Sequence, residues 1–130
     1  MLTSERIWAF NYERRSGDFI ARFARNTPVI GFGKSFQGTN LRDLHPPDIY
    51  PQAHANLLRV TIEPALCRLS GRIMKVDEQL VEGERIFMPM GSDESQAEGV
   101  FGASAFDFPF TKTPAHLELI HDIEDWYSLT

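Results

Sequence analysis

The side chains best suited to chemistry in this chain belong to one cysteine and four histidines. They are Cys67, His45, His54, His116 and His121. No two histidines have the H-E-x-x-H spacing of a helical zinc site, and a single cysteine forms neither an internal disulfide nor a cysteine-based metal cluster. No serine stands in a nucleophile-elbow pattern, and Gly31 and Gly33 lack the third glycine and the lysine of a phosphate-binding loop. The sequence therefore predicts no catalytic residue, no metal site and no enzyme activity.

His54 is the histidine with the clearest setting, because it falls in the strongest helical pattern of the first half of the chain, residues 50–63. Pro51 suits the first turn of a helix, and Pro64 ends the helix since proline lacks the backbone N–H that a helix needs. At about 100° per residue, the apolar side chains gather on one face. These are Ile49, Tyr50, Ala53, Leu57 and Val60. His54 lies at the edge of that face.

Alternating patterns predict five strands. Residues 6–24 read as a β-hairpin, with Trp8, Phe10 and Tyr12 on one face of the first strand and a tight turn at Ser16-Gly17. Three more strands are predicted over about 65–76, 83–90 and 99–108, with turns rich in glycine, aspartate and serine between them. Short helical pieces are predicted at Asn26-Thr27-Pro28 and around residues 41–44.

The last nineteen residues, 112–130, carry a helical pattern. Thr113-Pro114 combines a capping side chain with a proline suited to the first turn. Large apolar side chains follow at helical spacing and share one side, opposite an acidic side. They are Leu117, Ile120, Ile123, Trp126 and Tyr127. The sequence therefore predicts one folded domain over 1–111 and a flanking amphipathic helix over 112–130.

A hairpin, a helical crossover and a three-strand meander together predict an α+β fold, a five-stranded antiparallel sheet with helices on one face. In this order the elements resemble a PAS domain. The segment from Phe36 to Asp48, with Gly38 at a turn and Leu41 and Leu44 at apolar spacing, resembles the stretch that leads into the last helix of that family.

A second motif resembles a divergent bacterial PAS group that occurs as a single-domain protein. That group carries a Glu followed by an "LPL-S-x-D" strand and turn, which Glu84 and the segment 87–93 resemble here. The resemblance covers about residues 6–108. Light sensors of the family carry an Asn-Cys-Arg motif ahead of the long helix, whereas Cys67 follows it, so flavin photochemistry is not expected. Haem-binding members place an axial histidine on this helix, but His54 lies off the centre of the apolar face. The cofactor is left unknown, with haem and flavin disfavoured.

The resemblance implies a ligand pocket between the long helix and the sheet. Its candidate residues are Phe36, Tyr50, Ala53, His54, Leu57, Phe87, Met88 and Met90. Bulky apolar side chains on the first strand and on the tail predict an interface with a partner, although the same aromatic stripe is also typical of a packed core. The candidate interface residues are Trp8, Phe10, Tyr12, Ile120, Ile123, Trp126 and Tyr127.

Composition restricts the partners. The net charge of −5 and a sequence pI of about 5.3 disfavour nucleic acid, which is bound through a surplus of Lys and Arg. No apolar run approaches the ~18 residues that span a membrane, and no signal peptide is recognisable, so a cytoplasmic location is expected.

The resemblance implies a regulatory domain of bacterial signal transduction. It would bind a small apolar ligand, a signalling protein, or both, and form a homodimer. Two alternatives stay open: a dimerisation module without any ligand, and an enzyme or carrier of the cone-shaped α+β type. The second class begins with a long helix, whereas this chain begins with an aromatic strand.

Overall fold

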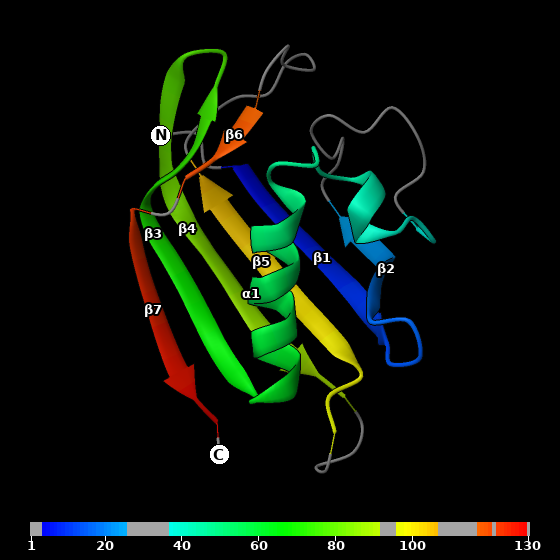
Figure 1. Ribbon diagram of the computed structural model, residues 1–130. Coiled ribbons are helices and arrows are strands. Elements are labelled where there is room, and N and C mark those ends of the chain that lie inside the picture. Colours follow the sequence, from blue (N-terminus) through cyan, green and yellow to red (C-terminus); the bar gives the residue numbers. More distant parts are fainter. Residues whose placement is uncertain (1–3, 26–36, 92–95, 107–116, 121, 130) are drawn as a thin grey trace.

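The computed structural model describes residues 4–25, 37–91, 96–106, 117–120 and 122–129. Within these ranges, seven strands form one antiparallel sheet, and an α-helix with a short 3-10 helix lies against one of its faces (Figure 1). The strands are β1 (Ser4–Glu13), β2 (Asp18–Arg25), β3 (Ala65–Val76), β4 (Gln79–Met90), β5 (Gly99–Phe106), β6 (Leu117–Leu119) and β7 (Ile123–Ser128). The helices are η1 (Leu41–Asp43) and α1 (Tyr50–Ile62).

The first strand of the chain lies inside the sheet. The strand order is β2-β1-β5-β4-β3, and β6 and β7 both pair with the outer edge of β3, one after the other. The predicted hairpin and the three-strand meander are confirmed, and the meander closes on the hairpin because β5 pairs with β1. Gly17, with φ of 78°, turns the first hairpin, where only a residue tolerant of positive φ fits without strain.

The long helix predicted over 50–63 is confirmed as α1. Pro51 occupies its first turn, and the helix ends just before the cis Glu63–Pro64 peptide bond. Figure 1 shows α1 crossing the sheet diagonally, and it packs on β3, β4 and β5. Leu57 and Val60 are buried on its inner face, as the apolar spacing predicts.

The hydrophobic core fills the layer between α1, η1 and the sheet. Its fully buried side chains come from both layers: Phe19, Leu41, Val60, Cys67, Leu69, Ile73, Val81 and Val100. Phe19 lies at the junction of the hairpin and the helix, because its ring centroid is 4.9 Å from that of Tyr12 and 5.5 Å from that of His54. The helix is therefore held against the hairpin as well as against the meander.

The prediction of a C-terminal helix over 112–130 is wrong within the described part of that segment. Residues 117–119 and 123–128 are strands instead, and so the sheet has two more strands than predicted. Helical spacing put Ile123, Trp126 and Tyr127 on one side, but strand alternation separates Trp126 from the other two. Trp126 packs against the core with the Arg59 guanidinium 4.0 Å above its ring, whereas Ile123 and Tyr127 are exposed. The backbone N–H and C=O groups along the edge of β3 need hydrogen-bond partners. In this tail that requirement outweighs the helical spacing of the apolar side chains.

Asp122 fastens the turn between β6 and β7 to β3. Its carboxylate accepts hydrogen bonds from the backbone N–H of Arg72 and from Nε and Nη2 of the same side chain, at 3.2, 3.1 and 3.0 Å. These bonds lower the pKa of Asp122. The neighbouring Gly71 has φ of 84°, and a Cβ there would lie 2.7 Å from the Asp122 carboxylate. The glycine therefore makes room for the contact that attaches the two short strands.

Candidate functional site

The predicted ligand residues divide between two faces of the sheet. Tyr50, Ala53, His54 and Leu57 lie on α1. Phe87 faces them from β4, because it is buried in the core beneath the helix and its ring lies 5.2 Å from that of Trp8. Phe36 lies outside the described residues.

Met88 and Met90 do not belong with these residues. Successive side chains of a strand point to opposite faces, so Met88 lies on the face away from α1 and pairs across the sheet with Phe101. The sulfur of Met90 is 3.9 Å from Nη1 of Arg22, also on that face. The prediction that both methionines line a pocket with α1 is therefore wrong.

His54 connects α1 to the first hairpin. Its Nε2 lies 2.7 Å from the backbone carbonyl of Gly17, and since a carbonyl only accepts, Nε2 carries the proton. The imidazole also packs between Phe19 and Tyr50, with both ring centroids 5.5 Å away. Coordination of a haem iron through Nε2 would require the bond to Gly17 to break. The geometry therefore gives His54 a structural role at this junction.

The aromatic side chains of β1 turn toward the helix. Phe10 is only 5% exposed and belongs to the core, and Trp8 and Tyr12 are half-buried against it. Trp8 lies over Gly102, where an added Cβ would meet the indole ring at 2.0 Å. Gly102 of β5 thus leaves room for a close-packed side chain, which is Trp8. For Phe10 this corrects the interface prediction, because a core side chain offers no surface to another molecule.

The remaining predicted interface residues lie in or beside the C-terminal strands. Ile120 follows β6 and is half-buried, with its backbone N–H bonded to the carbonyl of Ile73 at 3.0 Å. Trp126 is half-buried against the core. Ile123 and Tyr127 are exposed on the opposite face of β7. These four residues therefore do not form the single face that a helix would have presented.

An apolar row crosses the face of the sheet away from α1. Phe23, Ala9, Phe101 and Met88 are direct cross-strand partners on β2, β1, β5 and β4. The rings of Phe23 and Phe101 lie 6.3 Å apart, and Phe23 is 40% exposed. Sequence reasoning missed this row because it depends on strand order. Cross-strand neighbours of this kind form a continuous apolar surface.

A polar group lies on the inner face, beneath the helix layer. Nε of Arg85 on β4 donates to Oγ of Ser104 on β5 at 3.1 Å, and Ser104 is buried. Burial lowers the pKa of Arg85 to about 10. His45, in the segment between η1 and α1, has Nδ1 3.3 Å from the carbonyl of Leu41, and its pKa is lowered by burial and further by the charge of Arg85.

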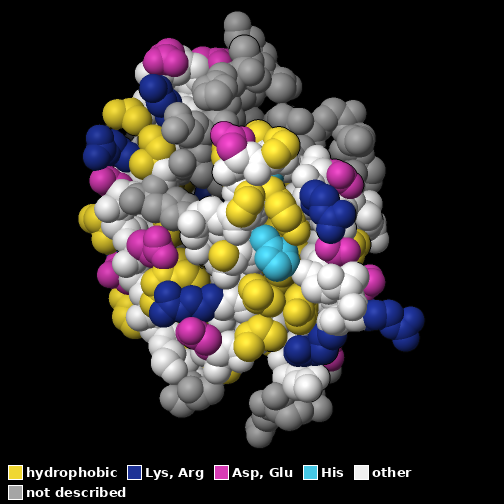
Figure 2. Space-filling view, in the orientation of Figure 1, with side chains coloured by type: hydrophobic (Ala, Val, Ile, Leu, Met, Phe, Trp, Pro, Cys, Tyr) yellow, Lys and Arg dark blue, Asp and Glu magenta, His cyan; other side chains and the backbone are white. Residues whose placement is uncertain are grey.

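Sequence reasoning also missed these polar residues, although the position of Arg85 in its strand could have indicated them. Arg85 has the strand parity of Phe87, so it occupies an inward position among apolar residues. A charged residue at an inward position is rare unless it is paired or binds something. Figure 2 shows the outer surface on the side of the molecule where α1 lies: hydrophobic side chains occupy its middle, and charged side chains lie around them.

Cys67 is the one cysteine of the chain, and it is fully buried on the inner face of β3. Burial, reinforced by the charges of Glu124 and Asp125, raises the pKa of its thiol to about 12. A thiol must ionise to act as a nucleophile. We therefore expect Ellman's reagent at about pH 8 to modify native Cys67 at least roughly a thousandfold more slowly than the unfolded chain, since only the unfolded fraction exposes it. Equal rates for native and denatured protein would contradict this burial.

In the described residues, no three or more His, Cys, Asp and Glu side chains come together as a metal site. His116 and His121 lie outside that part of the chain. No helix among the described segments has the length and apolar character to cross a membrane. Comparisons with protein-family models, curated proteins and solved structures gave no match to this chain. The evidence for function therefore comes from the arrangement of its own residues.

Proposed function

We propose that this chain is a PAS-type sensory domain, which binds a small molecule between α1 and the sheet and transmits that event to a protein partner without catalysis. The observation that carries the proposal is Arg85 on the inner face, which is hydrogen-bonded to buried Ser104 and whose charge reaches His45. A layer that served only as a core would gain nothing from a desolvated arginine that pairs with no carboxylate of the described residues. The order of hairpin, helical crossover and meander supports the PAS assignment.

The signal would be a shift between two arrangements of the helix layer. A ligand can favour one conformation only to the extent that it binds that conformation better. A molecule beneath α1 would contact the helix and β4 and β5 together, so its binding depends on where α1 lies. Phe87 and Trp8 pack between the helix layer and the middle strands, and the other face of those strands carries the apolar row. A shift of α1 would therefore alter the sheet to which a partner on that row binds.

Native mass spectrometry of the full chain, purified from bacterial cells, tests the binding function. We expect a species heavier than the chain, whose extra mass identifies the ligand class. Replacing Ala53 with phenylalanine should reduce the heavier species, because Ala53 packs against the core from α1 and a larger side chain fills space there. Ala55→Phe is the matched control, since Ala55 is exposed on the same helix.

A bare chain mass at every collision energy would contradict the ligand-binding function. It would favour the second candidate, a ligand-free dimerisation module, for which the apolar row of Phe23, Ala9, Phe101 and Met88 is the specific observation. In that case the same spectrum should contain a dimer that Phe101→Glu removes. A monomer in both proteins would exclude this candidate at the row.

A further inference from the structure

Arg85 occupies the middle of the sheet on its inner face. Its direct cross-strand neighbours are Leu69 on β3 and Ser104 on β5, and both are buried. The arginine side chain nevertheless keeps part of its surface exposed. It is therefore withdrawn from bulk water along most of its length, and only a small part of its surface stays accessible.

The guanidinium of Arg85 has unused hydrogen-bond donors. A guanidinium carries five N–H groups, and the one on Nε is bonded to Ser104. Among the residues that the structure describes, no acceptor pairs with Nη1 or Nη2 of Arg85. The four arginines 42, 59, 68 and 72 each pair with a carboxylate, on Asp18, Glu63, Glu84 and Asp122. These four ion pairs lie at the surface. Among the described residues Arg85 has no such pair, although it is the arginine whose charge water stabilises least.

His45 does not add a second positive charge. Its burial and the nearby Arg85 both lower its pKa, so the imidazole is neutral near pH 7. Because the Leu41 carbonyl only accepts, the proton lies on Nδ1 and leaves Nε2 as an acceptor. Arg85 and Ser104 therefore offer one positive charge, with a planar edge that has no partner among the described residues, beside a buried hydroxyl.

We propose that the ligand of this domain is a small amphipathic carboxylate, whose carboxylate group binds the Nη1–Nη2 edge of Arg85 and whose apolar body packs under α1. This inference rests on the proposed ligand-binding function and specifies its ligand class. The planar fork of arginine matches the two oxygens of a carboxylate. A single negative charge balances a single guanidinium, whereas a dianionic phosphate would leave one charge uncompensated in a poorly solvated site. The surrounding core cluster, including Phe87, Leu44 and Leu57, supplies the apolar contacts.

The test is a set of matched acids and amides. Sodium hexanoate, octanoate, phenylacetate and indole-3-acetate are each titrated into the full chain by calorimetry, in parallel with the corresponding amides at constant ionic strength. We expect at least one carboxylate to bind about tenfold to a hundredfold more tightly than its amide, the range of a charge-assisted hydrogen-bonded pair. Arg85→Met should abolish that difference, because it weakens binding of the carboxylate more than binding of the amide.

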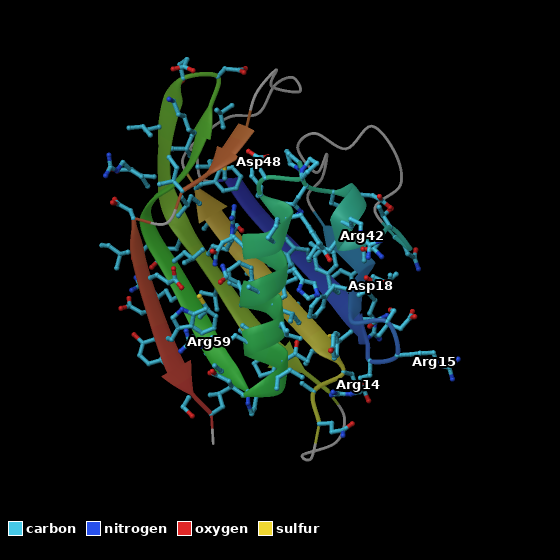
Figure 3. The ribbon with its side chains drawn as sticks, in the orientation of Figure 1. Arg14, Arg15, Asp18, Arg42, Asp48 and Arg59 are labelled. Atoms are coloured by element: carbon cyan, nitrogen blue, oxygen red, sulfur yellow. The ribbon has the colours of Figure 1, made fainter. Side chains whose placement is uncertain are left out.

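Arg15→Met is the control for loss of a positive charge. Arg15 lies in the turn of the first hairpin and projects away from the body of the molecule (Figure 3). Its removal should leave the acid preference unchanged. Without ligand, Arg85→Met should melt within a few degrees of the unmodified protein, because the lost bond to Ser104 is offset by replacing a desolvated arginine that has no carboxylate partner among the described residues.

Three results would overturn the carboxylate proposal. They are equal binding of every acid and its amide, an acid preference that survives Arg85→Met, and a fall of more than about 10 °C in the melting temperature of unliganded Arg85→Met, which would exceed the loss of the Ser104 bond and assign Arg85 a further structural partner. In the first two cases binding itself persists, so the ligand-binding function stands. Failure of all acids and all amides to bind would overturn this proposal, and the native mass spectrum independently decides whether the ligand-binding function falls with it.

Discussion

Replacing Phe19 with alanine should lower the free energy of unfolding by about 3–5 kcal/mol, a large part of the roughly 5–15 kcal/mol that stabilises a domain. Phe19 is 0% exposed, and its ring contacts Tyr12 of β1 and His54 of α1. Truncation removes buried apolar surface and leaves a cavity where hairpin and helix meet, since two other elements fix its walls. Urea denaturation followed by tryptophan fluorescence measures the effect.

Phe23→Ala is the matched control, because Phe23 is the same residue type on the same strand but faces away from α1 and is 40% exposed. Its cost should be less than about half that of Phe19→Ala, since a partly exposed ring loses less burial. Similar losses for the two variants would mean that α1 and the hairpin do not share a common core at Phe19.

Gly99→Ala should be the most disruptive single-methyl addition to the sheet, at about 3 kcal/mol. A Cβ at Gly99 would lie 2.0 Å from the backbone oxygen of Phe10 and 3.0 Å from Cα of Asn11. These are main-chain atoms of the paired strand, so no change of rotamer relieves the clash. β1 and β5 would have to separate at the start of their pairing, and thermal melts should show a correspondingly lower midpoint.

Gly102→Ala provides the comparison, because the obstacle there is a side chain. A Cβ at Gly102 would meet the ring of Trp8 at 2.0 Å. Adding Trp8→Leu should therefore recover part of the stability lost in Gly102→Ala, whereas the same second change should not rescue Gly99→Ala. Equal rescue of both glycine variants would show that the two clashes are relieved in the same way and would refute the distinction.

The local elements could be predicted from the sequence because their signals are local. Alternation in 6–14, the glycine turn and the Pro51-to-Pro64 segment specify a hairpin and a helix, and both are present. The tail was mispredicted because its apolar spacing satisfies a helix, while the open edge of β3 that selects a strand is a property of the assembled sheet. The spacing of apolar residues reports which side chains share a face. It contains no information on backbone hydrogen-bond partners that are distant in the sequence.

The candidate site was predicted in part. Leu57 and Phe87 do face each other across the core, because helix and strand periods each define an inward face. Strict alternation from Phe87 would also have placed Met88 on the opposite face and Arg85 on the inner one. What alternation could not supply is the strand order that puts Ser104 beside Arg85, or the loop that brings His45 near its charge.

Because β1 lies inside the sheet, one of its edges stays unpaired until a later strand has been synthesised. Ser4–Glu13 is made before the other strands of the sheet, yet one of its two edges pairs only with Gly99–Phe106, which follows more than 80 residues later. At about 5–20 residues per second, that edge waits on the order of 5–20 s for its partner. During this interval the ribosome carries a hairpin with an open hydrogen-bonding edge, the kind of surface that pairs with other chains. Pairing of β1 with the meander is therefore expected to begin only after Gly99–Phe106 has been synthesised.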